Sequence, residues 1–152
     1  MYIWFQRTSP YPMLVMFDAS ESNLTCTRRE RSNTPLQALT LLNDTVFMEC
    51  AQALAMRTAE TVPASGLAKN EMRAARVRGA FRLCLTRDPS PSELSALVDL
   101  YNQAVPLARK DSVAAQQIVG PRFPEIADLP ETAGCVAMAR AVLNLDEFLT
   151  RE

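Results

Sequence analysis

The sequence predicts an all-α protein, a compact bundle of five to six helices preceded by a short apolar N-terminal segment. Three observations predict this class. Helix-start signals, in which a capping side chain precedes a proline by one or two residues, recur at Thr34, Ser90 and Asp128. Apolar residues then follow at three- and four-residue spacing, the period of an amphipathic helix. No alternating apolar run bounded by turn residues indicates a β-hairpin.

Residues 1–33 are predicted to be an irregular N-terminal segment that ends in an Arg-rich loop. The apolar stretch 10–17 is long enough for one or two helical turns, whereas residues 23–33 are polar and cationic. The run Thr34-Pro35-Leu36-Gln37 then places a hydroxyl at the cap, proline at the first position and an amide at the third. This is the pattern of a capping box, so the first full helix is expected to start here.

Residues 34–152 are predicted to be the helical core of a single domain that spans 1–152. Each further helix is predicted from a capping side chain and from the break that ends it. Pro106, inside the segment that Ser90 caps, is expected to end or kink that helix, because proline lacks the N–H that the helix needs. The caps are Asp44, Asn70, Ser90, Asp111 and Asp128, and the breaks follow Thr58, Thr86, Pro106, Gly120 and Leu143.

The composition excludes several kinds of chemistry, because the 152 residues include no histidine. Ser-His-Asp and Cys-His catalysis and His-ligated zinc or haem are therefore excluded for this chain acting alone. Glycine-rich phosphate loops and calcium loops are also missing. Cys26, Cys50, Cys84 and Cys135 are too scattered for a Cys-x-x-Cys pair. We predict no catalytic residue, metal or cofactor, with Cys50 and Cys84 in the core and Cys26 accessible.

The charge balance argues against a nucleic-acid partner, because 16 basic residues face 17 acidic ones. The densest basic stretch includes Arg73, Arg76, Arg78 and Arg82. It is predicted to be a solvated helix face, and phosphate-backbone binding is the alternative. No secretory signal is visible at the start, and no apolar run is long enough to span a membrane.

One loop is a candidate binding site. Arg28, Arg29 and Arg31 lead into Asn33 and into Gln37 of the first capped helix. Guanidinium groups beside a helix N-terminus can hold an anion or a partner. The structural alternative is that acids such as Glu30 neutralise the arginines and that Gln37 only completes the capping box.

The segment CTRRERSNTPLQALTLLND, residues 26–44, resembles the signature of the planctomycete-specific domain one family (domain of unknown function 1553). Three further blocks are similar to the same family and occur in the same order. They are YIWFQRTSPYPMLVMFDAS at 2–20, AFRLCLTRDPSPSEL at 80–94 and ARAVLNLDEFLTRE at 139–152. The four blocks are spread along the chain from residue 2 to residue 152.

The resemblance implies a larger context. Such domains usually end large exported proteins in which a cytochrome-c-like domain and a second domain of unknown function come earlier. This chain would then be the C-terminal portion of a larger domain, in an exported or periplasmic parent protein. It departs from that pattern in having no haem motif of its own. The family has no agreed catalytic residues, so none is carried over.

We expect a non-catalytic helical module for interaction or structure. Its partner would be the upstream domains of a parent protein or another chain, and the apolar run Tyr2–Phe5 is a candidate for self-association. The alternative is part of an enzyme site that upstream residues complete, acting on an anionic or carbohydrate substrate through Arg28, Arg31, Asn33 and Gln37. Nucleic-acid binding through the stretch Arg73–Arg82 is a third possibility.

Overall fold

The computed structural model describes residues 6, 8–20, 25–28, 32–62, 66–121, 123 and 128–150, and the regular secondary structure in them is helical. The predicted all-α class is confirmed, because these residues contain helices and no strand. They form eight helices rather than five to six. Two of the eight are short: α1 (Pro12–Met16) has five residues and α8 (Asp146–Leu149) has four. The apolar run Tyr2–Phe5 lies outside the described residues.

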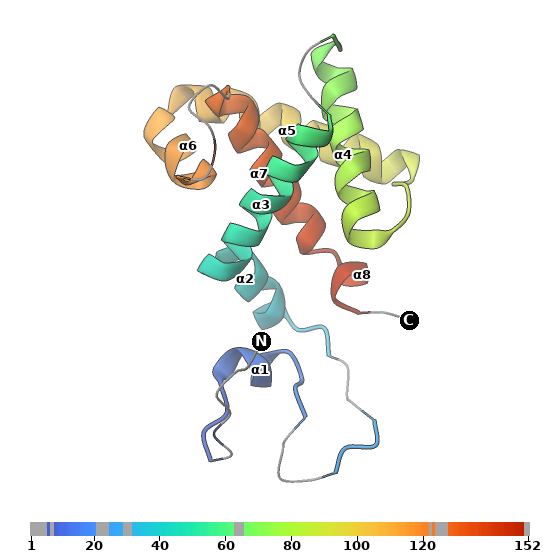
Figure 1. The fold of residues 1–152 in the computed structure, drawn as a ribbon, viewed down its shortest axis with the longest axis vertical. Helices are drawn as coiled ribbons and strands as arrows, with labels where there is room; N and C mark the ends of the chain where they lie inside the picture. Colours follow the sequence, from blue (N-terminus) through green and yellow to red (C-terminus); the bar gives the residue numbers. More distant parts are fainter. Residues whose placement is uncertain are drawn as a thin grey trace. The chain divides into compact units, whose positions relative to one another are not determined.

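The six longer helices follow the predicted order (Figure 1). They are α2 (Pro35–Asn43), α3 (Thr45–Thr61), α4 (Lys69–Leu85), α5 (Pro91–Lys110), α6 (Ser112–Val119) and α7 (Leu129–Leu143).

The chain divides into two compact units, residues 1–40 and 41–152. The division falls inside α2, whereas the sequence suggested a helical core that begins at residue 34. Unit 1 contains α1 and most of α2, and unit 2 contains α3 to α8. The main apolar core belongs to unit 2.

Helix α7 is the centre of unit 2, and it packs against α3, α4, α5 and α6 (Figure 1). Ten of its fifteen residues are buried. A helix surrounded in this way needs apolar or small side chains on every face rather than on one stripe. The sequence of α7 meets this need with alanine, glycine, cysteine, valine and methionine. The core around it is completed by large buried side chains from α4 and α5, chiefly Val77, Phe81 and Tyr101.

Most of the predicted helix starts are confirmed by side-chain caps. Asp44, Asp111 and Asp128 each accept a hydrogen bond from a backbone N–H in the first turn. Ser90 and Glu93 form a complete capping box, in which Ser90 N donates to the Glu93 carboxylate at 2.7 Å. These contacts satisfy N–H groups that the helix itself leaves unpaired.

Two helix boundaries correct the sequence predictions. Helix α4 starts at Lys69, and the backbone position that caps it is Ala68 rather than Asn70. Helix α5 continues through Pro106 to Lys110, although proline removes one helical hydrogen bond. Val105, the preceding residue, is buried in the core. Packing of α5 against α7 thus holds the helix together where propensity alone predicts a break.

Candidate functional site

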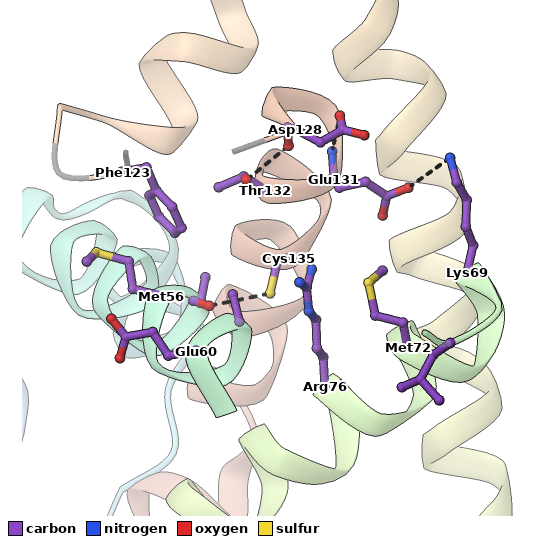
Figure 2. Close-up of a pocket in the computed structure, with 13 residues that line it drawn as sticks. Met56, Glu60, Lys69, Met72, Arg76, Phe123, Asp128, Glu131, Thr132 and Cys135 are labelled. Carbon is purple, nitrogen blue, oxygen red and sulfur yellow. Dashed lines mark hydrogen bonds and ion pairs between the residues drawn. The ribbon is translucent and has the colours of Figure 1, made fainter. Parts of the chain in front are cut away.

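Unit 2 contains a pocket of about 520 Å³ between α3, α4 and the first turns of α7 (Figure 2). Its buried lining residues are Ala55, Met72, Arg76, Glu131, Thr132 and Cys135. Half-buried walls come from Met56, Ala59 and Phe123. The exposed rim consists of Glu60, Leu67, Lys69 and Asp128. The pocket therefore joins apolar walls to a few polar groups, the usual make-up of a ligand site.

A buried ion pair lies beside the pocket. Arg73 of α4 donates to both oxygens of the Glu131 carboxylate on α7, from Nε at 3.1 Å and from Nη2. Its Nη1 donates to the Asn102 side chain, and its guanidinium lies 5.4 Å from the centre of the Tyr101 ring. Lys69 Nζ is a weaker partner, 3.9 Å from Glu131 Oε1. Both Glu131 oxygens are consequently occupied by cations of α4.

The second buried arginine, Arg76, reaches from α4 toward Cys135 in the pocket (Figure 2). It is 7% exposed. Its Nη1 donates to Tyr101 Oη at 3.0 Å, and its Nε donates to the Val62 carbonyl at 3.3 Å. Both acceptors are neutral. Among the described residues no carboxylate lies within ion-pair distance of Arg76.

Tyr101 and Cys135 are held as neutral groups. Tyr101 Oη donates to the Glu131 carbonyl at 3.0 Å, and burial raises the pKa of the phenol. The Cys135 thiol lies 3.5 Å from Thr58 Oγ1, and burial raises its pKa as well. A reactive cysteine needs the opposite shift, because the thiolate is the nucleophile. Neither side chain is thus activated for nucleophilic attack.

Part of the pocket lies in a segment of the chain that matches a family model. The family model PSD1, described as Protein of unknown function (DUF1553), matches residues 1–101. The chain belongs to this family. No curated protein and no solved structure matches the chain. The DUF1553 match ends at Tyr101, so it includes Arg73 and Arg76 but not Glu131 or Cys135. The resemblance predicted from the signature segments is confirmed at the level of the family.

The predicted anion site in the DUF1553 chain lies in unit 1, where the structure describes only some of its residues. Arg29 and Arg31 lie outside the described residues, and Arg28 is exposed. Asn33 is exposed and takes part in an interaction. Gln37 is 2% exposed. Binding of an anion by this loop stays a prediction.

Gln37 links three segments of unit 1. Its Oε1 accepts from Thr34 N at 3.0 Å while Thr34 Oγ1 accepts from Gln37 N at 3.2 Å, which confirms the capping box. Its Nε2 donates to the Met16 carbonyl at 2.7 Å and to Ser32 Oγ at 2.9 Å. The same Ser32 donates from its hydroxyl and its N–H to Asp18, and these bonds lower the pKa of the Asp18 carboxyl. The amide of Gln37 is accordingly used inside the fold.

The sequence prediction of a solvated arginine face is half wrong. Arg78 and Arg82 are exposed, as predicted, but Arg73 and Arg76 are buried. A signal was present, because the buried face of α4 has its own helical spacing. It consists of Met72, Arg73, Arg76, Val77, Ala80 and Phe81. A solvated face was the prediction for all four arginines, and long cationic side chains are indeed seldom buried unless they are paired.

The cysteines correct a second expectation. Cys26 is exposed, as predicted, but Cys50 is exposed too, and Cys84 is only half-buried. The buried face of α3 runs through Ala51, Gln52, Ala55 and Thr58, which turns Cys50 away from the core.

Over the part of the chain that the structure describes, no three Cys, Asp or Glu side chains are grouped to hold a metal ion. None of the eight described helices has the length and apolarity that a membrane crossing requires.

Proposed function

We propose that the chain is a non-catalytic helical interaction module of a larger, exported planctomycete-type protein, and that the pocket is its ligand site. One observation carries this proposal: an apolar pocket of about 520 Å³ contains a buried arginine without a carboxylate partner among the described residues. A volume of this size falls within the range of ligand pockets, roughly 300–1,000 Å³.

The chemistry of the pocket supports binding rather than turnover. An activated nucleophile needs a base within hydrogen-bond reach or a lowered pKa. The pKa of the Cys135 thiol is raised, and its neighbour Thr58 is not a base. The Glu131 carboxylate is engaged by Arg73. The alternative, an enzyme site around Arg28, Arg31, Asn33 and Gln37, has less support because the Gln37 amide is already bonded within unit 1.

The pocket can be tested with N-phenyl-1-naphthylamine, a neutral apolar probe that fluoresces when it leaves water. We expect the purified chain to bind this probe. The variant Ala59→Phe should weaken binding by about tenfold or more, because a ring on α3 fills the space that the probe needs. The matched control is Ala53→Phe, since Ala53 is exposed on the same helix and does not line the pocket.

Two results would overturn the proposal: no probe binding by the wild-type chain, or equal loss of binding in both phenylalanine variants. Turnover of simple ester, glycoside or phosphate substrates by the isolated chain would contradict its non-catalytic part. The larger parent is tested separately, by the mass of the native product detected with an antibody to this segment. A band well above 16.9 kDa is expected, and a band at that mass would contradict a larger parent.

A further inference from the structure

Arg76 is a buried cation whose hydrogen bonds to the described residues all go to neutral groups. A buried charge is strongly disfavoured unless an opposite charge accompanies it. Tyr101 Oη and the Val62 carbonyl solvate two of its N–H groups, but neither supplies a negative charge. Its Nη2 donates to no other described residue in the structure, although Arg76 lines the pocket. The Nη2 side of the Arg76 guanidinium is therefore available to a ligand in the pocket.

The three described acids that line the pocket do not pair with Arg76. Both Glu131 oxygens accept from Arg73. Asp128 caps α7, since its Oδ1 accepts from Glu131 N at 3.4 Å. Glu60 is exposed at the rim. None of these carboxylates is within ion-pair distance of Arg76, so among the described residues the Arg76 charge has no counter-ion.

We propose that the pocket binds an amphipathic monocarboxylate, with the carboxylate on Arg76 and the apolar part against Met56, Met72 and Phe123. This inference rests on the proposed function and names the chemical class of its ligand. The guanidinium forms the strongest hydrogen bonds to planar oxyanions such as carboxylates. The methionine side chains adapt to the shape of an alkyl or aryl group.

A monoanion fits this site better than a phosphate ester does. Phosphate sites usually gather several donors, such as helix N–H groups and more than one cation. Among the described lining residues only the Arg76 guanidinium lacks an acidic partner, and the rim carries Glu60 and Asp128 beside Lys69. Two rim carboxylates would repel a dianion about twice as strongly as a monoanion, because Coulomb energy scales with charge.

The test compares ligands that share one chain length and differ in their head group. Octanoate, methyl octanoate, octan-1-ol and octylammonium are titrated against the chain carrying N-phenyl-1-naphthylamine. We expect octanoate to displace the probe at least about tenfold more tightly than the ester and the alcohol, as a charge-assisted hydrogen bond predicts. Octylammonium should be the weakest. This comparison uses the wild-type chain, so it does not depend on the folding of a variant.

A variant then assigns the head-group contact. Arg76→Met should bring the affinity for octanoate down to that for the alcohol while the alcohol binds as before. Arg78→Met is the matched control, because Arg78 is exposed on α4 and does not line the pocket. It should leave the preference for octanoate intact.

The outcomes separate this inference from the function on which it rests. Displacement by octanoate and octan-1-ol at equal concentrations would overturn the carboxylate assignment and leave a neutral binding pocket. Displacement by inorganic phosphate alone would also overturn it, since it would indicate a general anion site. Failure of the neutral probe to bind would overturn the proposed function, and the carboxylate assignment with it.

Discussion

Gly134 of α7 lies directly against the ring of Tyr101 of α5. A Cβ added at Gly134 would be 2.7 Å from Cδ2 of that ring and 2.8 Å from Cγ2 of Val105. Real Cβ atoms do not approach other atoms so closely, so only glycine allows the two helices to pack at this distance. The contact also fixes Tyr101, whose hydroxyl links Arg76 to the Glu131 carbonyl.

The first prediction is that Gly134→Ala destabilises the chain by about 1–3 kcal/mol, the range for overpacking a core. The added methyl group forces α5 and α7 apart, and the better helix propensity of alanine does not compensate for that. Thermal unfolding followed by circular dichroism measures the effect. For a chain of this size, each kcal/mol lowers the Tm by roughly 2–4 °C.

Gly79→Ala is the control for this substitution. Gly79 lies within α4, and a Cβ there would meet only Thr58 Cγ2, at 3.8 Å, which is an ordinary contact. Alanine should stabilise the chain by roughly 0.4–1 kcal/mol, because it restricts the unfolded state. A Tm for the Gly134 variant equal to or above that of the wild type would show that the α5–α7 contact is looser than described.

The second prediction concerns the buried pair of Arg73 and Glu131. Glu131→Gln leaves the Arg73 guanidinium buried without a negative partner, and this should destabilise the chain by about 3–5 kcal/mol. The double variant Arg73→Met with Glu131→Met should recover most of that loss, since no buried charge remains. Urea unfolding of the two variants measures both effects.

An exposed pair provides the comparison. Arg82 Nε lies 2.7 Å from Asp88 Oδ1, but both side chains are more than half exposed. Asp88→Asn should therefore change stability by less than about 1 kcal/mol. Equal effects of Glu131→Gln and Asp88→Asn would mean that water reaches the buried pair freely.

The helices could be predicted because their start signals are local. A capping side chain and a nearby proline act within four residues, so Thr34, Asp44, Ser90, Asp111 and Asp128 identify helix starts without knowledge of the fold. The continuation of α5 beyond Pro106 could not be predicted in this way. It depends on packing against α7, which is distant in the sequence and overrides the local preference.

The candidate site was missed for a similar reason. Arg73 and Arg76 have the spacing of a buried helix face, but an arginine is buried only when other elements supply its partners. Those partners are Glu131 and Tyr101, which lie 58 and 25 residues further along the chain. One sequence without an alignment contains no record of such pairings. The Arg-rich loop could be identified from the sequence because its arginines are close together along the chain.

The third prediction is a loss of stability in acid that depends on Glu93. Hydrogen bonds from Arg87 and from the Ser90 N–H lower the pKa of Glu93 to about 2, from an ordinary value of 4.5. The ionised form is thus favoured in the folded chain, so its stabilising effect is complete above about pH 4.5. The effect disappears as the pH falls toward 2.

Glu93→Gln should accordingly lower stability at pH 7 and have a much smaller effect near pH 2, where about half of the wild-type carboxyl is protonated. Glutamine keeps the shape of the capping box, so the difference reports the charge. Urea unfolding at several pH values between 7 and 2 gives the profile. Asp99→Asn, an exposed position in the middle of α5, is the control. A stability difference that stays constant with pH would contradict the ion pair with Arg87.

The last prediction orders the four cysteines by their rate of reaction with a thiol reagent. Cys26 and Cys50 are exposed, so two thiols should react rapidly with 5,5′-dithiobis(2-nitrobenzoic acid) in the folded chain. Cys84 should react more slowly, because burial both limits access to its thiol and raises its pKa. Cys135 faces the core beside Thr58 and should react only when urea unfolds the chain.

Cys50→Ser makes this prediction specific. It should remove one of the two rapid thiols and leave the stability unchanged, because the buried face of α3 is formed by Ala51, Ala55 and Thr58 instead. Slow reaction of Cys50 would indicate that α3 is rotated about its axis, with Cys50 in the core as the sequence predicted. The pocket would change with it, since Ala55, Met56 and Ala59 line it from the same helix. The reaction rate of one surface thiol therefore tests the orientation on which the ligand site depends.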